Sequence, residues 1–201
     1  WTGKIAACLK NFKFHRYFLL QSDHLSQALA EFKPADGMEF IKYNFSDTYD
    51  KITQDLSPET QNGFWHLVYW KANRIYRKAC IEKTLFCNPL IAGDKYWKSI
   101  LHADNYEYHP PIAYGSEVFR LYSMSCINFS CSSIQMSEAV THRVFDVPAS
   151  GGFVITDARE QMSQLFDADK EFVSYSSIDD IKHLIEKYLR DDKGRVSIIK
   201  S

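Results

Sequence analysis

The C-terminal half of the chain alternates short apolar runs with amphipathic stretches. The clearest strand is expected at 152–157, where the nearly unbroken apolar run suits a strand that is covered on both faces. Further strands are expected at 85–88, 106–109, 126–130 and 172–175. Helices are expected at 95–101, 116–123, 138–148, 159–165 and 178–189. This rhythm predicts an α/β fold, a Rossmann-like doubly wound parallel sheet with helices on both faces.

The N-terminal third has a less regular pattern. It predicts a strand at 15–21, a helix at 23–32 and a strand at 38–43, with a loop at 34–37. A long helix is expected at 58–83, because apolar residues recur there at helical spacing. The chain is therefore divided into an N-terminal portion, residues 1–84, which could belong to the same α/β domain, and a Rossmann-like domain, residues 85–201.

Composition narrows the class of protein. The 201 residues carry 24 basic and 25 acidic side chains, and this balance argues against a nucleic-acid binder. No apolar run approaches the roughly 18–20 residues that span a bilayer, so no membrane span is predicted. The five cysteines form no CxxC pair, which predicts buried, inert thiols and a reducing, cytoplasmic location. The chain begins at Trp1 without an initiator methionine, and we expect it to be part of a longer protein.

The candidate chemistry lies between residues 130 and 157. The loop 131–137 follows an expected strand, and ligands of parallel sheets bind beyond the carboxyl ends of the strands. The hydroxyl groups of Ser132, Ser133 and Ser137 and the free backbone N–H groups of this loop could hold a phosphate. The alternative is a serine-rich capping loop without a ligand.

Two acids and an arginine follow this loop. Glu138 and Asp146 form an E-x7-D pattern, which places one carboxylate at the start of the expected helix and the other two turns later. Arg143 lies three residues before Asp146, on the same side of a helix. In a functional interpretation, Asp146 accepts hydrogen bonds from a ribose diol and Arg143 neutralises a diphosphate. In the structural interpretation, the two side chains form a surface ion pair.

A resemblance favours the functional interpretation. The run THRVFDVPASGGFVITD at 141–157, followed by Leu165-Phe166 and Glu171-Phe172-Val173, is similar to the C-terminal domain of CgeB-type glycosyltransferase-like proteins. In that family an N-x-R-x-F-D/E-x-x-A-x-G-G segment precedes a T-D pair, a helix and an L-F pair. The upstream segment 114–129 also resembles the family's strand–helix–strand unit. The resemblance covers about residues 85–190 and is typical of a GT-B donor domain.

The resemblance implies binding of a nucleotide-diphosphate sugar, without a cofactor or a metal, and transfer of the sugar to an unknown acceptor. In related retaining enzymes with an E-x7-E motif, the first acid lies near the sugar and the second near the ribose. Glu138 would then be the catalytic candidate, and Asp146 would bind the donor. The second acid is Asp rather than Glu, and Thr141 stands where many relatives have Asn. The chain could therefore be only the donor part of an enzyme, or a non-catalytic binding or structural module that retains the fold.

Overall fold

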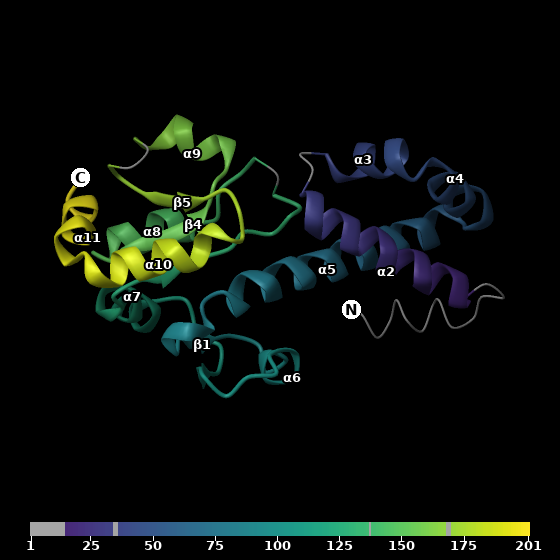
Figure 1. Ribbon diagram of the computed structural model, residues 1–201. Helices are drawn as coiled ribbons and strands as arrows, with labels where there is room; N and C mark the ends of the chain where they lie inside the picture. The colour runs from purple at the N-terminus through teal and green to yellow at the C-terminus, as the bar shows by residue number, and fades with distance from the viewer. Residues whose placement is uncertain (1–14, 34–35, 137, 168–169) are drawn as a thin grey trace. The chain divides into compact units, whose positions relative to one another are not determined.

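The computed structural model describes residues 15–33, 36–136, 138–167 and 170–201 (Figure 1). The chain divides into two compact units. The first comprises Trp1–Tyr76 with Ser133–Ser137, and the second comprises Arg77–Ser132 with Glu138–Ser201.

The described part of the first unit is built from helices. They are α2 (His15–Phe32), α3 (Gly37–Asn44), α4 (Ser46–Asp55) and α5 (Pro58–Glu82), of which α5 continues into the second unit. The long helix predicted at 58–83 is confirmed, but the strands predicted at 15–21 and 38–43 are wrong. Both predictions rested on short apolar runs, which do not distinguish a strand from one face of a buried helix.

Burial explains the helical outcome. Phe18, Leu25 and Leu29 are all buried, and their spacing of seven and four residues places them on one face of α2. The start of α3 is fixed by Asp36, whose Oδ1 accepts hydrogen bonds from the N–H groups of Met38 and Glu39 at 2.9 and 3.0 Å. Asp36 belongs to the predicted loop at 34–37, of which residues 34 and 35 lie outside the described residues.

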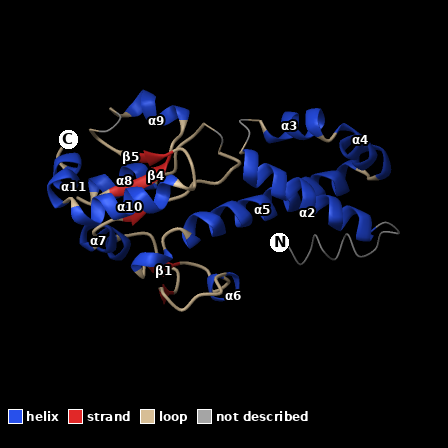
Figure 2. Ribbon diagram, viewed as in Figure 1, coloured by secondary structure: helices blue, strands red, loops and turns tan. Residues whose placement is uncertain are grey.

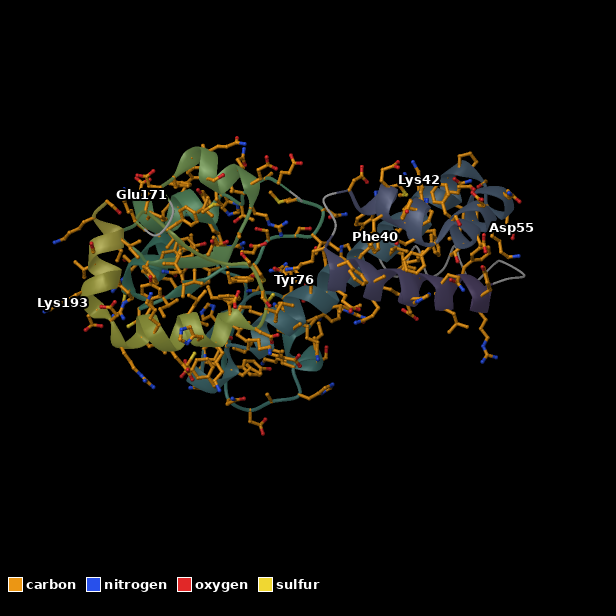
Figure 3. The ribbon with its side chains drawn as sticks, turned by 45° about the horizontal axis from the view of Figure 1, so that its top comes forward. Phe40, Lys42, Asp55, Tyr76, Glu171 and Lys193 are labelled. Atoms are coloured by element: carbon orange, nitrogen blue, oxygen red, sulfur yellow. The ribbon has the colours of Figure 1, made fainter. Side chains whose placement is uncertain are left out.

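An aromatic cluster packs α3 within this unit. The Phe40 ring, labelled in Figure 3, lies 5.5 Å from the Phe32 ring and 6.1 Å from the Phe45 ring, measured between centroids. Lys42, two residues further along α3, is exposed and pairs with Glu39. Phe40 therefore packs within the aromatic cluster, whereas Glu39, Lys42 and Tyr43 of the same helix are exposed.

The second unit is α/β and contains two parallel sheets. The first pairs β1 (Leu90–Ala92) with β2 (Glu107–His109). The second has the order β3 (Asn128–Phe129), β4 (Val154–Asp157), β5 (Val173–Tyr175). The strands predicted at 106–109, 126–130, 152–157 and 172–175 are confirmed, although each is shorter than expected.

The strand predicted at 85–88 is wrong. These residues form a short 3-10 helix, η1 (Leu85–Cys87), and Asn88 then adopts a left-handed conformation with φ of 51°. Asn tolerates that conformation better than most residues, so the chain can turn here before β1 begins at Leu90. The apolar run at 85–87 is too short to show whether its hydrophobic residues repeat with the period of a strand or of a helix, so it does not predict which one forms.

Helices connect and flank these strands (Figure 2). They are α6 (Trp97–Ile100), α7 (Ser116–Met124), α8 (Arg143–Ala149), α9 (Glu160–Leu165), α10 (Asp180–Arg190) and α11 (Asp192–Ile199). Of these, α8 contacts β4 and α10 contacts β5. The strands of the larger sheet follow one another in sequence order, so the strand-order reversal of a doubly wound sheet is not seen within it, and that layout stays a prediction.

The helix predicted at 138–148 begins five residues late, at Arg143. The preceding segment is held instead by Gln161, whose N–H donates to the Glu138 carbonyl at 3.2 Å and whose Oε1 accepts from the Val140 N–H at 2.9 Å. The helix ends at Ala149, and Gly151, two residues further on, has a φ of 76°, which glycine adopts without strain. The later start changes the position of Asp146, which lies in the first turn of α8 rather than two turns into a helix.

Cys87, Cys126 and Cys131 are free thiols, and Cys8 lies outside the described residues. Within the described ranges, no helix combines the length and the apolar character needed to cross a membrane.

Candidate functional site

A buried ion pair closes the carboxyl end of β4. Asp157, the last residue of this strand, is 4% exposed. Its Oδ2 accepts hydrogen bonds from Nε of Arg159 at 2.8 Å and from Nη2 of the same guanidinium. Its Oδ1 accepts from the backbone N–H of Ser132 at 2.8 Å. Asp157 thus ties the turn that follows β3 to the end of β4.

The serine loop uses its donors within the protein. Ser132 is buried, and its N–H is taken by Asp157. Ser133 belongs to the first unit, where its hydroxyl and the N–H of Ile134 both donate to Oδ1 of Asn73 at 2.8 Å. Ser137 lies outside the described residues. The N–H groups of Ser132 and Ile134 therefore point at protein oxygens rather than at an open phosphate site.

Asp146 lies in a group of polar side chains in the second unit. The Tyr114 hydroxyl donates to Oδ1 of Asp146 at 3.2 Å, and Nε2 of His142 lies 3.9 Å from Oδ2. The Oδ2 atom is buried and has no hydrogen-bond donor among the described residues. Burying a carboxylate oxygen without a donor is unfavourable, so this atom has an acceptor capacity that a ligand could satisfy.

The partners of Asp146 differ from those expected. The structural interpretation paired Asp146 with Arg143, but the side chain that the structure places beside its Oδ2 is His142, at 3.9 Å. Arg143 is the half-buried first residue of α8. Tyr114 was not recognised as a site residue, because it precedes Asp146 by 32 positions. Its position immediately before the predicted helix 116–123 is the signal that could have found it.

The Tyr114 side chain is exposed apart from its contacts with this group. Tyr114 is 69% exposed, and its ring meets the His142 ring edge-on, with 6.1 Å between the ring centroids. Desolvation of the hydroxyl and its hydrogen bond to Asp146 raise the pKa of Tyr114 above the ordinary value. The hydroxyl therefore stays protonated and donates to Asp146 across the neutral pH range.

Glu138 lines a pocket that does not include Asp146. It is exposed, in the loop before α8, and lines a pocket of about 200 Å³ together with Ala139 and α9 residues Glu160, Gln161 and Gln164. No hydrogen bond joins Glu138 to Asp146 in the described ranges. The two acids of the E-x7-D pattern thus contact different sets of residues, Glu138 near α9 and Asp146 near Tyr114 and His142. Nor does any group of three or more His, Cys, Asp or Glu side chains in these ranges have the arrangement of a metal site.

A buried thiol cluster lies behind the carboxyl end of β3. A hydrogen bond with Cys80 and the charge of Arg77 outweigh burial and lower the pKa of Cys131 to about 7. Cys80 in turn accepts a hydrogen bond from the Tyr175 hydroxyl at 3.7 Å. The sequence predicted inert buried thiols, and it could not show that two distant cysteines and an arginine meet here.

The sequence of the chain was compared with known proteins, protein families and solved structures. No curated protein and no solved structure matches the chain. Residues 74–201, more than half of the chain, match the family described as glycosyl transferase-like. This segment contains the α/β sheets, the Asp146 group and the Glu138 pocket. The chain therefore belongs to the glycosyl transferase-like family.

Proposed function

We propose that the chain is the donor-binding part of a GT-B glycosyltransferase of the CgeB type, which transfers a sugar from a nucleotide-diphosphate sugar to an acceptor. Family membership supports glycosyl transfer. The nucleotide-sugar donor is supported by the Asp146 group, because a carboxylate with unused acceptor capacity suits a ribose diol. The free thiols among the described cysteines support a reducing, cytoplasmic setting.

The buried Oδ2 of Asp146 is the observation that carries this proposal. The exposed imidazole of His142 lies beside this atom, with 62% of its side chain exposed. Such a side chain can rotate away at small cost, because little of its surface is packed. A ribose hydroxyl that takes its place would donate to Oδ2, while Tyr114 continues to hold Oδ1.

The remaining candidate residues have separate roles in this proposal. Arg143, next to His142 at the start of α8, would neutralise the charge of the diphosphate. Glu138 is kept as the catalytic candidate, and its pocket with Gln161 and Gln164 offers amide groups to sugar hydroxyls.

A second candidate is a non-catalytic binding or structural module with the same fold. The serine loop favours it, because the backbone N–H groups of Ser132 and Ile134 are bonded to Asp157 and Asn73. A donor enzyme would need diphosphate contacts from elsewhere, and Arg143 is the candidate that the second unit offers.

Thermal melting with a panel of UDP-, GDP-, ADP-, CMP- and dTDP-linked compounds separates the two candidates. A compound that binds only the folded chain, supplied at a concentration about 100 times its Kd, adds roughly 2.7 kcal/mol to the free energy of unfolding. We expect one base to raise the melting temperature well above the others. A panel without any shift would favour the structural module.

The variant Asp146→Ala locates the binding. It removes a charge-assisted hydrogen bond of about 1.5–3 kcal/mol, so nucleotide affinity measured by titration calorimetry should fall about 10- to 100-fold. Asp146→Glu keeps the carboxylate and should retain much of the affinity. Unchanged affinity in Asp146→Ala would contradict the role of Asp146.

A further inference from the structure

A larger pocket in the second unit has no part in the proposed donor site. Its volume is about 540 Å³, and its lining includes Lys98, Leu101, His102, Asp104, Tyr106 and Tyr108. Volumes of about 300–1,000 Å³ are typical of small-molecule sites. The pocket shares no residue with the Asp146 group or with the Glu138 pocket.

The backbone that carries this lining is held at several points. Leu101 is 3% exposed, and its N–H donates to the Trp97 carbonyl at 3.0 Å. The side-chain amide of Asn105 donates to the Leu85 carbonyl at 2.6 Å. The Tyr108 hydroxyl donates to the Gly93 carbonyl at 3.1 Å. A lining fixed in this way loses little conformational entropy when a ligand binds.

The polar side chains of the pocket are available to a ligand. The Lys98 ammonium lies 4.3 Å from the centroid of the Tyr108 ring, which fixes a cation at the wall. The His102 imidazole and the Asp104 carboxylate are exposed, and neither makes a hydrogen bond or ion pair to another described residue. Tyr106 and Tyr108 are half-buried and supply aromatic surface. Donors and an acceptor thus surround an aromatic wall.

We propose that this pocket binds a neutral sugar ring. Sugar hydroxyls both donate and accept hydrogen bonds, which matches a lining that holds an ammonium, an imidazole and a carboxylate together. The C–H faces of the ring are apolar and suit the tyrosine surfaces. The opposite charges of Lys98 and Asp104 offset each other, so this pair gives the pocket no preference for an anion or a cation, which suits an uncharged ligand. That this sugar is the acceptor rests on the proposed function, whereas its binding here does not.

Saturation-transfer NMR on the full chain tests the proposal. The probes are the methyl glycosides of glucose, galactose, mannose and N-acetylglucosamine, and at least one should receive saturation from the protein. Its affinity should fall about tenfold in Tyr106→Ala and several-fold in Asp104→Asn, as expected for losing an aromatic wall and a charged acceptor. Tyr96→Ala is the matched control, because Tyr96 is 61% exposed at the start of α6 and does not line the pocket.

The outcomes separate this inference from the proposed function. Absence of saturation transfer to all four glycosides, or equal affinity in Tyr106→Ala and the unmodified chain, would overturn the sugar site. Binding of inorganic phosphate at Lys98 in place of a glycoside would overturn it as well. Glycoside binding without any nucleotide binding would leave the sugar site standing and reject the donor proposal. Nucleotide binding without glycoside binding would do the reverse.

Discussion

At the carboxyl ends of β3 and β4, the contacts of a single residue, Asp157, connect the two strand ends within the second unit. Asp157 and Arg159 form an ion pair with side chains 5% and 9% exposed, and Asp157 also holds the N–H of Ser132. Removing one partner of a buried pair leaves a charge without its counter-charge in a medium of low polarity. Asp157 is therefore a structural residue whose influence reaches the loop after β3.

The variant Asp157→Asn should lower the free energy of unfolding by about 3–5 kcal/mol, because it removes the negative charge that faces the buried Arg159 guanidinium. Urea denaturation followed by circular dichroism measures the change. Asp179→Asn is the control, since the Asp179 side chain is 85% exposed in its pair with Lys83 and its loss should have a much smaller effect on stability. Equal effects of the two substitutions would contradict this role of Asp157.

Cys131 gives the second unit a pH dependence. Its folded pKa is about 7, against an ordinary value of 9.0, so the thiolate is favoured by folding. Stability should rise as the pH increases from 7 to 9, by about 2–3 kcal/mol, and this gain is lost as the pH falls through 7. Urea midpoints across this range measure it. Cys131→Ser should flatten the profile, whereas the exposed Cys126→Ser should leave it unchanged; identical slopes in the two variants would disprove the assignment.

Asp146 could be predicted from the sequence as a site residue, whereas its distant contact partner Tyr114 could not. The acid belongs to a local pattern, whereas Tyr114 meets it across 32 positions, and Cys80 meets Cys131 across a longer interval. Such meetings depend on how β3, β4 and their flanking helices pack, and no local period encodes them. The ribose role of Asp146 and the catalytic role of Glu138 stay predictions.

At the scale of elements, the buried run of β4 and the long helix α5 were predictable, whereas the short apolar runs at 15–21, 38–43 and 85–88 were not. The strand β4 has four buried residues in succession, which leaves little ambiguity. By contrast, the run at 38–43 contains only one fully buried residue, Ile41, and became the helix α3. The start of α8 was placed five residues early because Gln161, far along the chain, holds the backbone at Val140.

Close packing at Gly152 gives a prediction at this scale. A Cβ added there would lie 2.6 Å from the Tyr122 carbonyl oxygen and 3.0 Å from Nδ2 of Asn128, so α7 or β3 would have to shift. Gly152→Ala should cost about 1–3 kcal/mol of stability by urea denaturation. Gly63→Ala is the control, because nothing lies within 4 Å of its added Cβ in α5, and it should stabilise by up to about 1 kcal/mol. A neutral Gly152→Ala would show that the two segments are less tightly packed.

At the scale of the whole molecule, the family match and the fold coincide. The match covers residues 74–201, and this range contains both parallel sheets, whereas the described residues before it form helices. The function of the family therefore has to be sought in the second unit. The helical unit was the part that the sequence pattern described least well, because the strands expected at 15–21 and 38–43 are helices.

Hydrogen exchange measured by mass spectrometry on the full chain tests this assignment. With the nucleotide that gives the largest melting shift, amide exchange should slow in peptides covering 112–118 and 140–148, because bound ligand shields Tyr114, His142 and Asp146 and damps local opening there. Peptides from α2 to α4 serve as the internal control and should exchange at an unchanged rate. Protection centred on 131–134 would instead support the serine loop as the phosphate site, since its N–H groups would have to leave Asp157 and Asn73 for the ligand. Protection centred on 98–108 would place the nucleotide in the larger pocket and contradict both the donor site and the neutral sugar site.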